Sequence, residues 1–235
     1  MFLLIMALFT STSNTAHSMN PFFTDYETPF QIPPFEEIKM EHYKPGFEQG
    51  MKENLDEIND ITANTEAATF ENTIVALERT GETLDKVADV FFNLLSSNTN
   101  DQMDSLVQEM SPKLSAHRDS ILLNKDLFHR VKSVYEKRKS LSLNPEQTRL
   151  IEETHKYFVR AGVQLDENSM ERLTEINQKL SSLSVQFDQN LLKETNEGFI
   201  LVIDDKDQLH GLPKDVVDQA SALAEAEDHS GKWLF

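Results

Sequence analysis

The stretch that decides the fold is Thr69 to Asn100, TFENTIVALERTGETLDKVADVFFNLLSSNTN. Its apolar residues recur at steps of three and four, the spacing of one face of an α-helix. Thr69 is a residue type that caps helices, and Gly81 is a weak point inside the run. The sequence therefore predicts one long amphipathic helix, whose stripe is Ile74, Leu77, Leu84, Val87, Phe91 and Leu94.

The same spacing continues on both sides of this stretch. It predicts helices from His42 to about Ile61, from Asp101 as the cap to about Ile121, over 126–139, and from Pro145 to about Gly162. Pro112 interrupts the second of these, so a kink or a break is expected near Ser111. Asn144-Pro145-Glu146-Gln147 is a strong start for the last one, with Asn as the cap and Pro at the first position.

A further helix has the most regular stripe in the chain: Leu173, Ile176, Leu180, Leu183, Phe187 and Leu191. This near-heptad spacing favours long antiparallel packing, and such a stripe is usually the core of a helix bundle. We therefore expect it to be buried. With only 7 Gly and 8 Pro in 235 residues, the helices together predict a mainly α fold with a helical domain over 42–197.

The segments at the two ends differ from this helical domain. Residues 19–41 combine prolines with aromatic residues, which predicts an extended arm lying across the helices; a polyproline ligand is the alternative, but a clean Pro-x-x-Pro pattern is missing. Residues 198–235 predict a strand near 199–203, a helix from Leu212-Pro213, and the start of a second strand at 232–235. Because a chain rarely stops inside an apolar run, we expect the natural product to continue beyond this point.

Residues 1–18, MFLLIMALFTSTSNTAHS, resemble a secretory signal peptide. A short apolar run precedes small polar residues, and Ala16 could stand before a cleavage site. The positive charge expected before the run is missing, so a periplasmic or secreted protein is the prediction and a cytoplasmic one the alternative. No segment is long and apolar enough to cross a bilayer, so no membrane association is expected after removal of the signal.

The net charge of −18, from 22 Lys and Arg against 40 Asp and Glu, bears on the choice of partner. Nucleic acid is disfavoured because its phosphates would be repelled and no basic patch offsets the repulsion. Attraction of cationic peptides and simple solubility remain open as explanations. The chain has no Cys, so disulfides, thiol catalysis and Cys-based zinc sites are excluded.

A search for catalytic and metal-binding residues yields none. No two of the seven His are four residues apart, so the paired His of a zinc peptidase helix are missing. Glu152 and His155 form a single Glu-x-x-His, whereas a di-iron bundle needs two. His117 is interpreted as a hydrogen-bonded structural histidine. The acidic group at Glu225, Glu227 and Asp228 lacks the spacing of a calcium loop and is interpreted as a solvated face.

Several blocks, in order, resemble the N-terminal region of the thimet-oligopeptidase-like zinc metallopeptidases, and most of all the bacterial peptidyl-dipeptidase branch. The blocks are Asn20-Pro21-Phe22, Pro33-Pro34-Phe35, Glu41-His42-Tyr43, Phe70-Glu71-Asn72-Thr73, Phe91-Phe92-Asn93-Leu94, Leu114-Ser115-Ala116-His117-Arg118-Asp119, and EINQKLSSLSVQFDQNLLKETN ending at Asn196. Together they extend from about Asn20 to Phe235.

The resemblance implies a helical lobe of a two-lobed enzyme whose deep channel admits short peptides. It also implies zinc, held by a His-Glu-x-x-His motif and a later Glu that lie in the C-terminal region, and removal of dipeptides from C-termini. None of those residues has a counterpart here, so no catalytic or metal role carries over, and this chain should be inactive alone. The alternative is a stand-alone helical protein that binds peptides without cleaving them. A lobe that lacks its partner region is expected to expose an apolar patch and to associate.

Overall fold

The structure is a computed structural model that describes residues 20–195 and 200–235. The signal-like segment 1–18 lies outside the described residues. The described chain is mostly helical, which confirms the mainly α prediction. Its α-helices and strands are α1 (Met40–Ala63), α2 (Ala76–Glu78), α3 (Glu82–Ser97), α4 (Asp101–Leu122), α5 (Lys125–Lys137), α6 (Pro145–Ala161), α7 (Glu167–Lys193), β1 (Val202–Ile203), α8 (Lys214–Ala226) and β2 (Trp233–Leu234).

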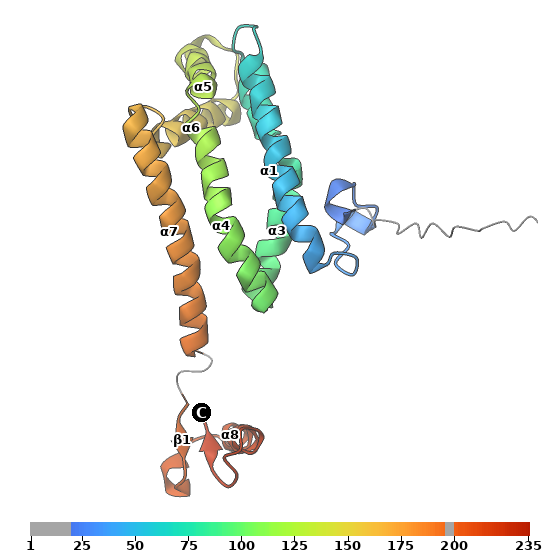
Figure 1. The fold of residues 1–235 in the computed structure, drawn as a ribbon, viewed down its shortest axis with the longest axis vertical. Coiled ribbons are helices and arrows are strands. Elements are labelled where there is room, and N and C mark those ends of the chain that lie inside the picture. The colour runs from blue at the N-terminus through green and yellow to red at the C-terminus, as the bar shows by residue number, and fades with distance from the viewer. Residues whose placement is uncertain (1–19, 196–199) are drawn as a thin grey trace, which may run out of the picture.

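The long helices α1, α4 and α7 run along the body of the molecule, with α3 beside α1, and α5 and α6 lie at one end (Figure 1). The helix α4 lies between α1 and α7, and α7, at one edge of the body, packs mainly on α4. This arrangement leaves a long side of α7 without a neighbouring helix among the described residues.

Helix starts follow the capping residues in the sequence. The predicted start of α6 is confirmed: the Asn144 side chain accepts from the Gln147 backbone N–H at 2.8 Å, and Gln147 Oε1 accepts from the Asn144 N–H at 3.0 Å. The predicted cap of α4 is wrong by one residue. Asn100 fills that position, and its side-chain oxygen accepts from the N–H groups of Gln102 and Met103. Asp101 is instead the first helical residue, where a negative charge favours the helix dipole.

The single helix predicted over 69–100 is wrong, because the chain turns at Gly81. A π-helical turn over Phe70–Val75, capped by Thr69, leads into the short α2, and α3 begins only at Glu82. Gly81 has a φ of 88°, a left-handed conformation that favours glycine. Its N–H donates to Glu57 Oε2 of α1 at 2.7 Å, which fixes the turn against that helix.

Of the kink or break expected near Ser111, the break is wrong, and the kink stays a prediction. Helix α4 continues from Asp101 through Pro112 to Leu122. Proline removes one backbone donor from the helix, but the residues on both sides pack into the interior. Met110 and His117 are both buried on the same helix. Packing of the flanking turns thus outweighs the local preference of proline to interrupt a helix.

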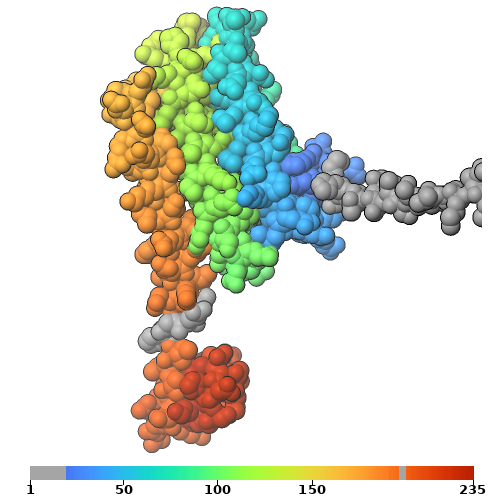
Figure 2. Space-filling model, in the orientation of Figure 1, coloured from blue at the N-terminus to red at the C-terminus, as the bar shows by residue number. Residues whose placement is uncertain are grey.

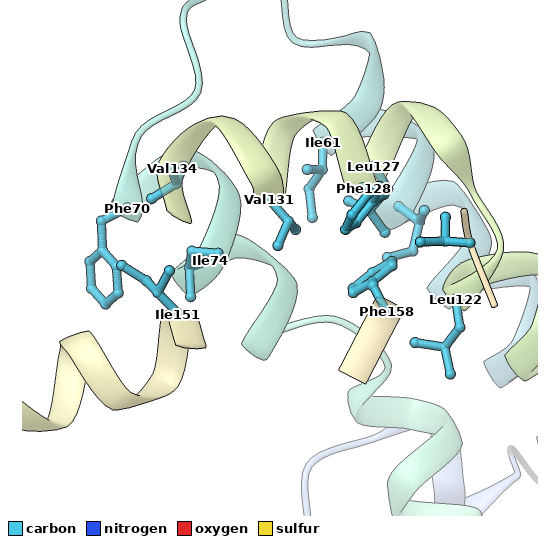
Figure 3. Packing of buried hydrophobic residues seen from close by; sticks show 12 residues of the cluster. Ile61, Phe70, Ile74, Leu122, Leu127, Phe128, Val131, Val134, Ile151 and Phe158 are labelled. Carbon is cyan, nitrogen blue, oxygen red and sulfur yellow. The ribbon is translucent and has the colours of Figure 1, made fainter. Parts of the chain in front are cut away.

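The interior consists of two clusters of buried residues. One lies where α5 and α6 meet the π-helical turn and α1, and it includes Phe70, Ile74, Phe128, Ile151 and Phe158 (Figure 3). The other joins α1, α3 and α4 around the rings of Tyr43, Phe47 and Phe91. Helix α1 contributes to both clusters, with Tyr43 and Phe47 in one and Ile58 and Ile61 in the other.

The arm over 19–41 packs on the helices near its start and again at Ile38, but not at Phe30, so the expected burial of its aromatic residues is partly wrong. Phe22 is buried against Tyr43, and Asn20 Nδ2 donates to the His42 carbonyl at 2.8 Å. Phe30, by contrast, is 96% exposed, in a tight turn at Pro29–Gln31 with a φ of 59°. That turn closes its own hydrogen bond, from Gln31 N–H to the Thr28 carbonyl, without the help of the helices.

The last described residues, 200–235, form the predicted strand–helix–strand. Strands β1 and β2 are antiparallel, with Val202 opposite Leu234 and Ile203 opposite Trp233. Leu201 and Phe235 exchange backbone hydrogen bonds of 2.8 and 3.0 Å beside this pair. Leu234 is buried, as are Ala220 and Ala224 of α8, which packs on β2.

Candidate functional site

His117 is a structural residue in the middle of the helical body. Its Nε2 lies 2.8 Å from the Asn54 Oδ1 of α1, and both side chains are buried. Asn54 also lies against the turn at Gly81, where an added Cβ would come within 3.2 Å of its side-chain nitrogen. The hydrogen bond expected of His117 is therefore present.

Stability should fall in mild acid because of this residue. Burial lowers the pKa of His117, so the folded state holds the neutral ring. Below the ordinary pKa of about 6.5, the unfolded chain binds a proton that the folded chain does not, and stability falls as pH falls toward the lowered value. Urea unfolding at pH 7.5 and pH 5 measures this loss. A His117→Gln variant, with a side chain that can still hydrogen-bond to Asn54, should show a smaller loss; an equal loss in both proteins would contradict the prediction.

Glu152 and His155 do not face a common centre. Glu152 accepts from Arg138 Nε at 3.1 Å, and the His155 ring stacks on Tyr135 with centroids 3.9 Å apart. The Arg138 guanidinium lies 3.9 Å from the centroid of the same tyrosine ring. These contacts hold α5 against α6, and both residues take part in that packing.

The acidic group near the end of α8 fixes a turn. Glu225 accepts from the Ser230 hydroxyl at 2.7 Å and from the Gly231 N–H at 3.2 Å. Within residues 20–195 and 200–235, no three His, Asp or Glu side chains lie together as metal ligands would. No helix in those same ranges has the length and apolar character that crossing a bilayer requires.

The stripe of α7 is exposed, which contradicts the prediction that it forms a bundle core. Ile176, Leu180, Leu183, Phe187 and Leu191 are between 46% and 65% exposed. The opposite side of α7 contacts α4: Gln189 Nε2 donates to the Asp104 carbonyl at 3.0 Å, and Val185 packs on the cluster around Phe91. Periodicity showed which face is apolar but not what covers it. Figure 2 shows α7 along one edge of the body.

A groove of about 660 Å³ follows the junction of α4 and α7, beside this stripe. Asp119 and Asn177 lie in its wall; Asn177 Nδ2 donates to the two carboxylate oxygens of Asp119 at 3.0 and 3.1 Å. Leu173 and Leu180 of α7 also line it, so the groove and the stripe are continuous. Sequence reasoning missed this pair, although Asn177 lies four residues after Leu173, at helical spacing.

Comparison with known proteins identifies relatives over nearly the whole chain. The chain is 37% identical over 218 residues to dipeptidyl carboxypeptidase of Escherichia coli, an alignment that covers 93% of this chain and 32% of that protein. It is 24% identical to oligopeptidase A of Escherichia coli, over 88% of this chain and 30% of the relative. The chain is homologous to the N-terminal part of peptidases of the thimet-oligopeptidase family. No protein-family model matches it.

The likeness to the thimet-oligopeptidase family extends to plants. Organellar oligopeptidase A of Arabidopsis thaliana is 24% identical over 95% of this chain and 28% of the relative. The chain therefore spans about a third of the length of the curated relatives it matches, in their N-terminal part.

Proposed function

We propose that this chain is the N-terminal helical lobe of a zinc-dependent peptidase of the thimet-oligopeptidase family, which hydrolyses short peptides and releases dipeptides from their C-termini. The observation that carries the proposal is the 37% identity to a dipeptidyl carboxypeptidase across 93% of the chain. The family's two-lobed architecture would make this lobe one wall of the peptide channel.

The residues present do not fit a zinc site. The sequence has no His-Glu-x-x-His, and the His117 and His155 rings have protein partners. We therefore assign zinc, and the water that it activates in the family, to a C-terminal catalytic region outside these residues. The chain by itself should be inactive, and its contribution is shape and the admission of substrate.

Charge supports short peptides over nucleic acid as the ligand of the whole enzyme. The chain has a net charge of −18, which attracts cationic peptides and repels phosphate backbones. We also propose that the signal-like residues 1–18 direct export to the periplasm or the medium, with a cytoplasmic enzyme as the alternative. That proposal rests on their sequence pattern alone.

A peptide-hydrolysis assay tests the proposed function. The purified 235-residue chain, supplied with zinc and a set of short peptides, should release no dipeptide. The natural coding region, cloned with its downstream sequence, should encode His-Glu-x-x-His and a later Glu, and its product should release dipeptides in a zinc-dependent way. A downstream region without that motif, together with peptide binding but no cleavage, would support the stand-alone binding protein instead.

A further inference from the structure

The exposed face of α7 has the composition of a buried interface. From Ile176 to Leu192, only Lys179 and Asp188 carry a charge, whereas 26% of the whole chain is charged. Depletion of charge around large apolar side chains is typical of the centre of a protein interface. From Ile176 to Leu191 the stripe is about 22 Å long at 1.5 Å per residue, too long for one small ligand but suited to a helix.

The groove beside the stripe contains a buried carboxylate without an ion-pair partner. Asp119 is 8% exposed, and within the described ranges its one side-chain partner is Asn177, with no Lys, Arg or His in ion-pair distance. Arg118 and Arg160 also line the groove, but neither forms an ion pair with Asp119 among the described residues, and the Arg118 guanidinium donates to the Tyr157 hydroxyl of α6. A carboxylate can accept about four hydrogen bonds, and a buried charge is costly unless it is paired.

We propose that α7 and the α4–α7 groove dock an amphipathic α-helix that places one Lys or Arg against Asp119. The apolar side of that helix would cover Leu180, Leu183 and Phe187, and its cation would complete the hydrogen bonding of the buried carboxylate. The source of the helix is the remaining two-thirds of the peptidase, and in this respect the inference rests on the proposed function.

A second copy of this chain fits the surface less well. Two copies would bring together molecules with a net charge of −18 each, and the exposed stripe of α7 offers Lys179 as its one cation between Ile176 and Leu192. An incoming helix with a basic residue at the centre of its apolar side would cover the apolar stripe and also supply a cation to Asp119. A preference for a cation opposite Asp119 therefore distinguishes binding of the proposed helix from non-specific apolar association.

A charge-swap binding experiment tests the proposal. The probe is a labelled 22-residue amphipathic helical peptide with Leu at helical spacing and a single Lys at the centre of its apolar side; a second peptide has Glu in place of that Lys. Anisotropy titrations use the full 235-residue chain. The Lys peptide should bind at least about tenfold more tightly than the Glu peptide, a difference of about 1.4 kcal/mol. Raising the salt concentration should weaken binding of the Lys peptide.

Three variants separate the contribution of the Asp119 charge to peptide binding from that of the apolar stripe. Asp119→Asn, which keeps the shape of the side chain, should reduce the preference for Lys to less than about threefold. Phe187→Ser, at a 65% exposed position, should weaken binding of both peptides at least about tenfold without unfolding the chain. Phe30→Ser, at a 96% exposed position on the arm, is the matched control and should change nothing. Circular dichroism melts confirm that each variant is folded.

Equal binding of the two peptides to the wild-type chain would overturn the proposal. A wild-type chain that is dimeric by light scattering, and monomeric after Phe187→Ser, would also overturn it in favour of a second copy. The proposed function stands or fails separately, because dipeptide release by the longer natural product is measured without these peptides. Active enzyme with α7 variants at full activity and stability would disprove the docking alone.

Discussion

Replacing Phe91 by alanine is expected to lower the free energy of unfolding by about 3–5 kcal/mol. The Phe91 side chain is fully buried where α1, α3 and α4 meet. Its ring lies edge-on to Tyr43 at 5.2 Å and to Phe47 at 5.4 Å between centroids. Removal of the ring would forfeit these aromatic contacts and leave a cavity that the surrounding rings cannot fill. Urea unfolding followed by circular dichroism measures the change.

Phe92→Ala is the matched control for this prediction. Phe92 is the next residue of α3, also carries a ring, and is 39% exposed. Its loss should therefore cost about 1 kcal/mol, because less apolar surface returns to water. Similar losses of stability in the two variants would show that α3 does not pack with Phe91 buried and Phe92 at the surface.

Gly50→Ala should destabilise the chain by about 1–3 kcal/mol, although the same change inside most helices stabilises them by about 1 kcal/mol. The reason is the close approach of α1 to α3. A Cβ at Gly50 would lie 2.7 Å from the Leu84 Cα and 2.8 Å from the Leu84 backbone nitrogen. Backbone atoms cannot move aside as the end of a side chain can, so the two helices would have to separate.

Lys52→Ala on the same helix controls for helix propensity. The Lys52 side chain is 68% exposed and pairs with Asp56 one turn away, so its loss should change stability by less than about 0.5 kcal/mol. Thermal and urea unfolding of both variants test the contrast. A Gly50→Ala protein that is more stable than the wild type would refute the close packing of α1 on α3.

The sequence predicts where the helices lie better than it predicts which residues of other helices contact them. Asn144 and Gly162 bound α6 because capping and a left-handed end depend on a few adjacent residues. The break at Gly81 could not be placed, because it depends on Glu57 and Asn54 from another helix. A weak point in the periodicity was visible there, but local propensity alone does not distinguish a tolerated glycine from a turn.

The candidate site shows the same division between local and distant information. The sequence pattern showed that the residues from Leu173 to Leu191 form an apolar face. It did not predict that this face is exposed, because periodicity does not show whether another element covers a face. The apolar patch expected from the sequence agrees with this exposure, and the expected association stays a prediction. Asp119 with Asn177 was missed because the two residues are 58 positions apart and each is an ordinary polar residue in its own helix.

The helix α1 belongs to both buried clusters. Because one continuous helix joins them, the two clusters cannot unfold independently, and their unfolding should be cooperative. Native-state hydrogen exchange should then find the slowest backbone amides near Asn54, between Phe47 and Ile58. Peptides from α7, which packs mainly on α4, should exchange through a separate opening of lower free energy.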